Sequence, residues 1–169
     1  EILNELGVTD YRMGVLRGSI YLRNNEKLNA REAALYTLSS LDADDVNKED
    51  YLKVNLDALG ILSDAGGKLT LIEKKSSELI SLMEKKLALN PDDMELRPIM
   101  AKTYLLIGRT LFQKNDESSQ MMALDAFDNA LSVAEVVPAQ IGQFILFISG
   151  ISEDRIREAL IEGRGVATG

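Results

Sequence analysis

The sequence contains no cysteine and no histidine among its 169 residues. Without cysteine the protein forms no disulfide, and it has no thiolate that could act as a nucleophile or bind a metal. Without histidine it lacks the side chain most often used as a general base and as a metal ligand near neutral pH. Any catalytic site would therefore have to be built from carboxylates, lysine, tyrosine or serine.

Proline and aromatic residues are also scarce, with three prolines and 5% aromatic residues. The remaining composition, 46% hydrophobic and 27% charged, is typical of a globular chain. A domain of this length buries about two thirds of the surface of its unfolded chain, so it can fold without a disulfide or a metal. The composition favours helices over an all-β sandwich.

Basic clusters and long apolar runs are missing as well. The net charge is -8, and the longest basic runs are the pairs at 74–75 and 85–86, so we expect no nucleic-acid partner. The longest apolar run, "FILFI" at 144–148, is too short to span a bilayer, which predicts no direct membrane insertion. Residues 1–20 lack the layout of a signal peptide, which favours a soluble, cytoplasmic chain. Because the chain begins at Glu1 without Met, an exported or membrane-tethered parent chain stays open.

Capping signals predict where helices begin. An Asn followed three residues later by an acidic residue can cap a helix, and a proline can occupy its first position, as Pro91 would. Pro98 lies inside the helix expected after Pro91, and it predicts a kink or a new helix start there. The capping pairs are Asn29 with Glu32, Asn47 with Asp50, and Asn90 with Asp93.

Turn residues predict where the helices end. The stops are "RNN" at 23–25, "LDADD" at 41–45, "AGG" at 65–67, "KND" at 114–116 and "SG" at 149–150. No segment alternates polar and apolar residues strictly, so we expect an all-α protein of antiparallel helical hairpins. The predicted helices are 9–23, 30–41, 48–65, 68–89, 91–114, 118–136, 138–149 and 152–163.

Small and aromatic residues recur at helical spacing in the second half of the chain. Tyr104 and Gly108 lie four residues apart, and Ala123, Phe127 and Pro138 follow at the intervals of a second helix and a closing proline. This spacing resembles the tetratricopeptide repeat, a pair of antiparallel helices. Further copies contain Gly60, Ser76 and Pro91, and Gly18, Tyr21 and Ala34. The copies recur after about 47 residues, whereas the family's repeat is about 34 residues long.

The resemblance implies a right-handed array of about three hairpins with C-terminal capping helices. It implies a single domain over residues 1–163, followed by a tail at 164–169. Gly18, Gly60 and Gly108 would lie where helices cross closely. The function implied is that of a non-catalytic interaction module: an adaptor, a chaperone or an assembly scaffold for a protein or peptide.

In this family the first helix of each hairpin lines a groove that holds a peptide. The corresponding positions here mix apolar and charged side chains, which suits a peptide with one or two hydrophobic anchors. The candidate groove residues are Arg12, Val15, Asp57, Ile61, Lys102, Leu105, Arg109 and Phe112.

A helical-bundle enzyme, or a binder of a small molecule or a metal, is the alternative. Its acid, base or metal ligands would be carboxylates such as Asp57, Asp64 and Glu78. The acidic loop 42–50 lacks the glycine and the final glutamate of a helix-loop-helix calcium site. We therefore expect no metal, no cofactor and no enzymatic activity.

The apolar segment 137–150 follows the last closing proline. Its apolar residues cover more than one face of the expected helix, so one face would cover the end of the array and Phe144 and Phe147 would remain as a candidate interface. Burial of this segment within the chain, and contact with an identical chain or another partner, both stay open.

Overall fold

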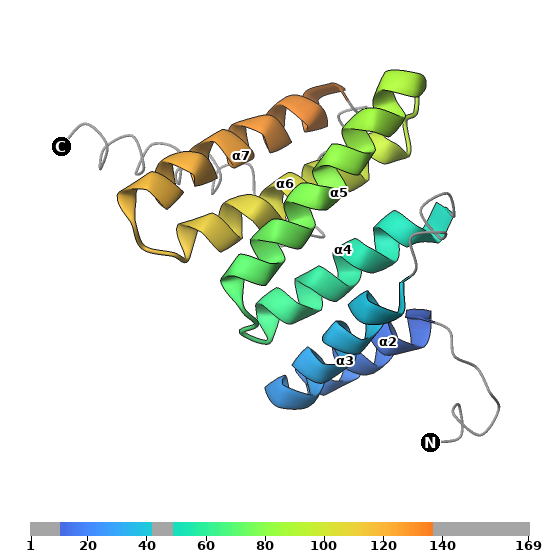
Figure 1. Ribbon diagram of the computed structural model, residues 1–169, viewed down its shortest axis with the longest axis vertical. Helices are drawn as coiled ribbons and strands as arrows, with labels where there is room; N and C mark the ends of the chain where they lie inside the picture. Colours follow the sequence, from blue (N-terminus) through green and yellow to red (C-terminus); the bar gives the residue numbers. More distant parts are fainter. Residues whose placement is uncertain (1–10, 42–48, 137–169) are drawn as a thin grey trace. The chain divides into compact units, whose positions relative to one another are not determined.

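The structure is a computed structural model that describes residues 11–41 and 49–136 (Figure 1). Within these ranges it contains six α-helices and no β-strand, which confirms the all-α prediction. The stacking expected of tetratricopeptide hairpins stays a prediction. The helices are α2 (Tyr11–Arg23), α3 (Lys27–Ser40), α4 (Glu49–Asp64), α5 (Leu69–Leu89), α6 (Leu96–Phe112) and α7 (Glu117–Val136).

The chain divides into two compact units, Glu1–Lys68 and Leu69–Gly169. The boundary falls between α4 and α5, which are the two helices that the sequence pairs as its second hairpin. The single domain expected over residues 1–163 stays a prediction. The predicted helices 138–149 and 152–163, Pro138 and the tail 164–169 lie outside the described residues.

Three helices are followed, two or three residues after their last residue, by a residue with left-handed backbone geometry. Asn25 has φ 62°, Gly66 has φ 73° and Asn115 has φ 63°. Glycine and asparagine adopt this conformation most readily, and they reverse the chain where a helix stops. After the reversal the Gly67 N–H donates to the Leu62 carbonyl over 2.7 Å, which satisfies a carbonyl of the last turn. The predicted stops "RNN", "AGG" and "KND" are confirmed.

The predicted cap at Asn29 is wrong. Helix α3 begins at Lys27, and the Asn29 amide donates to the Glu26 carboxylate over 2.8 Å. The reversal at Asn25 leads the chain directly into α3, so the helix can begin at Lys27, directly after Glu26. Asn47 lies outside the described residues, so its pairing with Asp50 stays a prediction.

The predicted cap at Asn90 is also wrong, because α6 begins at Leu96 and not at Pro91. The Asp93 carboxylate accepts the N–H groups of Glu95 and Leu96, over 3.1 and 3.2 Å. Pro98 is thereby placed in the first turn of α6, where the N–H that it lacks would have no helical partner. The new helix start expected near Pro98 is confirmed.

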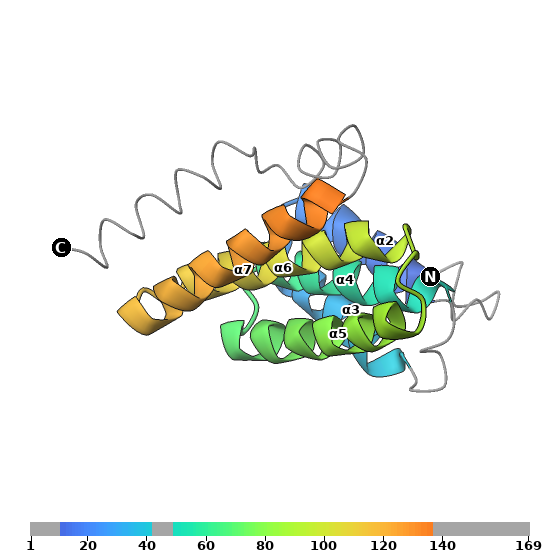
Figure 2. The ribbon, with the colours of Figure 1, turned by 90° about the horizontal axis from the view of Figure 1, so that it is seen from above.

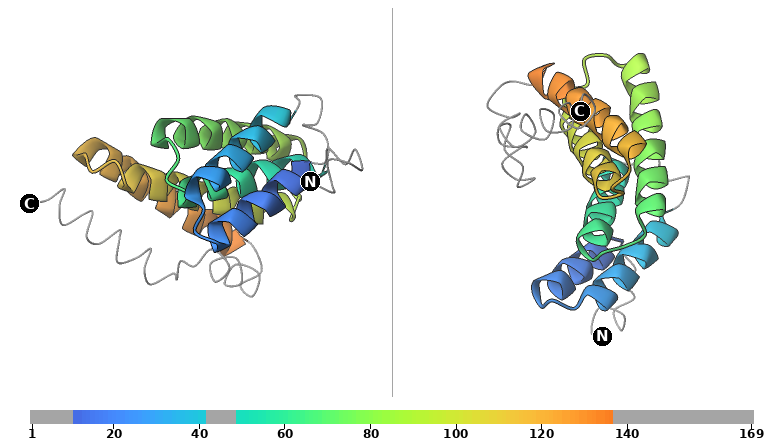
Figure 3. Two further views of the ribbon diagram at one scale, coloured as in Figure 1. Left: turned by 90° about the horizontal axis from the view of Figure 1, so that it is seen from below. Right: turned by 90° about the vertical axis from the view of Figure 1, so that its left-hand side faces the viewer.

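In the first unit, α2, α3 and α4 each pack against the other two (Figure 3). A Cβ added at Gly18 would lie 3.1 Å from Cγ2 of Ile61 on α4 and 3.7 Å from Cβ of Ala33 on α3. The close crossing predicted at Gly18 is confirmed. Gly14, one turn earlier, lies closer still to the hydroxyl of Thr37 on α3, a contact that the repeat spacing does not predict.

The close crossing predicted at Gly60 is wrong. Apart from its own stretch of α4, no described residue has an atom within 4 Å of the place that a Cβ at Gly60 would occupy. The repeat spacing assigned Gly60 to the same position as Gly18, but spacing alone does not determine whether another helix lies over that position. Gly60 therefore leaves open space on α4.

In the second unit, α6 packs against both α5 and α7, and α6 and α7 lie side by side (Figure 2). A Cβ at Gly108 would lie 2.5 Å from Cε1 of Phe127, so the ring of α7 occupies the space that the glycine leaves on α6. The close crossing predicted at Gly108 is confirmed. The core around this contact consists of Leu105, Leu111, Ala123, Leu124, Phe127 and Ala130.

Candidate interaction surface

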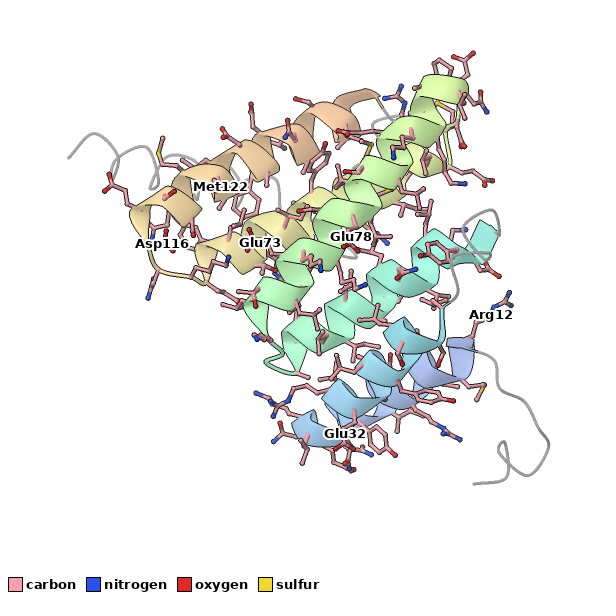
Figure 4. All side chains as sticks on the ribbon, in the orientation of Figure 1. Arg12, Glu32, Glu73, Glu78, Asp116 and Met122 are labelled. Carbon is pink, nitrogen blue, oxygen red and sulfur yellow. The ribbon has the colours of Figure 1, made fainter. Side chains whose placement is uncertain are left out.

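Four of the predicted groove residues lie in the first unit. Arg12 is exposed at the start of α2 (Figure 4), where its guanidinium forms an ion pair with Asp50 of α4. Val15 is half-buried, and Asp57 is exposed on α4. Ile61 is only 7% exposed and packs where α4 meets Gly18. A partner could contact Arg12 and Asp57 directly, whereas Ile61 contributes to packing between helices.

The other four lie on α6 in the second unit. Lys102, Leu105, Arg109 and Phe112 follow one another at intervals of three and four residues, so they form a stripe along one face of the helix. Leu105 is 2% exposed and belongs to the core, and the half-buried Phe112 packs against that core. Lys102 and Arg109 are partly exposed. We call these four residues the α6 stripe. It carries two cations separated by two helical turns, with an aromatic ring beyond the second cation.

The eight predicted residues thus form two sets, one in each unit. A single groove through both sets stays a prediction. Phe144 and Phe147, the candidate interface, lie outside the described residues.

Two polar contacts join α5 to α6, and sequence spacing predicts neither of them. Lys114, just beyond the end of α6, forms a partly buried ion pair with Glu73 of α5. Tyr104 donates a hydrogen bond to Glu84, and its pKa is raised by burial first and then by the charge and hydrogen bond of that carboxylate. Both contacts keep α5 beside the helix that carries the predicted cations.

Several large apolar side chains are exposed, and the sequence analysis does not single them out. Leu16 and Ile20, which lie one turn apart on α2, are 51% and 47% exposed, and Met121 on α7 is 48% exposed. Gly14 and Gly18 identify the inner face of α2, and the opposite face is then the one that carries Leu16 and Ile20. That spacing is the signal from which this exposed face could have been predicted. The other exposed large apolar residues are Leu28, Leu35, Tyr36, Leu89, Met94 and Met122.

The carboxylates of the alternative function lie on two helices of different units. Asp57 and Asp64 are exposed on α4, and Glu78 on α5 lies 3.6 Å from the Lys75 ammonium. Among residues 11–41 and 49–136, no group of three acidic side chains is placed to hold a metal ion. In the same ranges no helix has both the length and the apolar character needed to cross a membrane.

No protein-family model matches this sequence, and neither a curated protein nor a solved structure is found to be similar to it. The resemblance to the tetratricopeptide repeat therefore rests on the chain's own residues.

Proposed function

We propose that this chain is a non-catalytic protein interaction module built from helical hairpins similar to tetratricopeptide repeats. It would serve as an adaptor, a chaperone or an assembly scaffold. Its partner would be a protein segment that contacts the α6 stripe with a hydrophobic anchor near Phe112 and with acidic residues near Lys102 and Arg109. Such anchored peptides are a common ligand of helical grooves.

The observation that carries the proposal is the contact between Gly108 and Phe127. These residues stand at the small position of the first helix and the aromatic position of the second helix in the repeat pattern. Their contact supports the register in which Lys102 and Arg109 lie on one side of α6, where both are partly exposed. Opposite charges across such a surface accelerate association and select the partner.

The experiment is capture of partners from cell extract by the chain and by the double variant Lys102→Glu with Arg109→Glu. We expect a captured protein to be lost, because the variant repels an acidic segment, while the circular dichroism spectrum stays unchanged. The matched control is Lys74→Glu with Lys85→Glu, which makes the same charge change at two exposed positions of α5. It should retain the partner.

Two results would contradict the proposal. If the α6 double variant unfolds, Lys102 and Arg109 are structural and the stripe is not a binding surface. If both double variants lose the partner equally, the effect comes from total charge and not from the α6 stripe.

A further inference from the structure

The outer face of α2 carries two cations around two apolar side chains. Arg12, Leu16, Ile20 and Arg23 succeed one another at intervals of four, four and three residues, which places all four on one side of the helix. All four are exposed. We call this set the α2 stripe.

The α2 stripe belongs to a basic part of the sequence although the whole chain is acidic. Residues 11–41 contain five basic and two acidic residues, which gives a net charge of +3 in a chain of net charge -8. An exposed apolar face with this charge is suited to an apolar surface that carries carboxylates. Because Arg12 also pairs with Asp50, the charge of Arg23 is the more informative one to change.

The outer face of α7 has the opposite charge and the same spacing. Glu117, Met121, Asp125 and Asp128 succeed one another at intervals of four, four and three residues, and all four are exposed. Residues 117–136 contain four acidic residues and no basic residue. We call the set of four the α7 stripe.

The two stripes match in length as well as in charge. Each extends over eleven helical steps, about 16 Å at the rise of an α-helix. Whether the helices run in the same or in opposite directions, an arginine meets a carboxylate at each end. In either direction, Met121 meets one of the two apolar side chains of α2. The other apolar side chain of α2 meets Asp125, so the two stripes match in charge at both ends and in one apolar pair between them.

We propose that the α2 stripe of one molecule docks on the α7 stripe of a second copy. Leu16, Ile20 and Met121 remain about half exposed in the single chain, so their burial is left for a partner. The contact joins two different surfaces and leaves a free α7 stripe on one copy and a free α2 stripe on the other. Such a head-to-tail contact continues from copy to copy unless it closes into a ring. This self-association does not depend on the α6 stripe.

The test measures self-association by analytical ultracentrifugation over a wide concentration range. The wild type should associate as concentration rises, and added salt should dissociate the assemblies because the contact is partly ionic. Arg23→Glu and Asp128→Lys should each weaken association by about tenfold, since repulsion replaces attraction. The controls Lys53→Glu and Asp92→Lys change the same charges at exposed positions outside both stripes, and they should associate like the wild type.

Mixing the two stripe variants tests the head-to-tail geometry. Arg23→Glu retains an unchanged α7 stripe, and Asp128→Lys retains an unchanged α2 stripe. An equal mixture should associate again, although each variant alone is largely monomeric. It should stop at a one-to-one dimer if the two helices run in opposite directions, and grow further if they run in the same direction, because the two reversed charges then face and attract each other. If circular dichroism shows that a reversal perturbs the fold, Arg23→Gln and Asp128→Asn replace the reversals and should show smaller losses.

Three outcomes would overturn the proposal. The wild type could remain monomeric at every concentration. The stripe variants could associate like their controls, or their mixture could fail to associate.

Discussion

Gly108 shows how one absent side chain fixes the position of a helix. The ring of Phe127 lies against the backbone of α6, with Cδ1 2.7 Å and Cζ 2.9 Å from the place of a Cβ. A ring held on both sides in a core has little freedom to move aside. Any side chain at this position must therefore displace either the ring or the helix.

We predict that Gly108→Val destabilises the protein by about 1–3 kcal/mol through overpacking against Phe127. Gly60→Ala is the opposing control, because the space beside Gly60 is open and alanine favours helix over glycine. It should stabilise α4 by about 0.5–1 kcal/mol. Urea unfolding of both variants measures the two effects. An unchanged midpoint for Gly108→Val would contradict the packing described for α6 and α7.

Ser76 is a second residue whose surroundings predict the effect of a substitution. It is fully buried in α5, and its hydroxyl has no hydrogen-bond partner among the residues that the structure describes. The buried hydroxyl of Thr110, by contrast, donates to the Leu106 carbonyl over 2.7 Å. A buried polar group without a partner costs stability because it has given up its hydrogen bonds to water.

We predict that Ser76→Ala raises the free energy of unfolding by about 1 kcal/mol, since it removes this unpaired hydroxyl. Ser77→Ala in the same helix is exposed and measures the gain from helix propensity alone. Chemical denaturation of the two variants should show a larger gain at position 76. Equal gains, or a loss at position 76, would mean that Ser76 has a partner in solution.

At the scale of elements, α7 begins at a carboxylate that is held in its ionised form. The Asp116 carboxylate accepts hydrogen bonds from the hydroxyl and the N–H of Ser119, the latter over 2.8 Å. The Ser119 hydroxyl and then its N–H lower the pKa of Asp116 below the ordinary value of 3.8. The ionised form is therefore favoured in the folded chain over the unfolded one.

A group whose pKa is lowered by folding stabilises the protein above its unfolded pKa, and this stabilisation is lost as the pH falls through the folded pKa. We predict that Asp116→Asn removes this contribution. The difference in unfolding free energy between wild type and variant should be constant near neutral pH, decline below pH 3.8, and vanish below the lowered pKa. Denaturant titrations at stepwise lower pH test this, with Asp92→Asn as a control. A difference that persists unchanged in strong acid would contradict it.

The ends of helices were predictable to different degrees. The stops at Asn25, Gly66 and Asn115 depend on backbone geometry that few residue types adopt. The residue types at these positions therefore indicate the stops. The first residues of helices were harder to predict, because several neighbouring polar residues can cap a helix. The sequence predicted Asn90, whereas Asp93 makes the capping contacts. The choice depends on where the following chain is packed, which local sequence does not contain.

The candidate site was predictable as helix faces but not as exposed surface. Periodicity correctly groups Lys102, Leu105 and Arg109 on one face of α6. It does not indicate that Leu105 is buried in the core while the two cations remain partly exposed. Burial depends on which neighbouring helix covers a face, and that information is distributed over distant parts of the sequence. For the same reason the exposed Met121 was missed.

At the scale of the whole molecule, the charges are distributed unevenly along the chain. The helices of opposite charge, α2 and α7, belong to different units, Glu1–Lys68 and Leu69–Gly169. A net charge of -8 alone would predict that copies repel one another. The separation of a basic helix from an acidic one allows attraction at short range despite that repulsion. The predicted association should therefore depend on which residues carry the charge more than on their total.

The packing of α2, α3 and α4 against one another involves only chain that precedes Lys68. Contacts between neighbouring helices close short loops, and folds dominated by such contacts form quickly. During synthesis these three helices leave the ribosome first, so their contacts can form while α7 is still being translated. The basic face of α2 would then be exposed on a nascent chain before α7 has been translated. The order of translation thus separates in time the two surfaces that finished molecules would bring together.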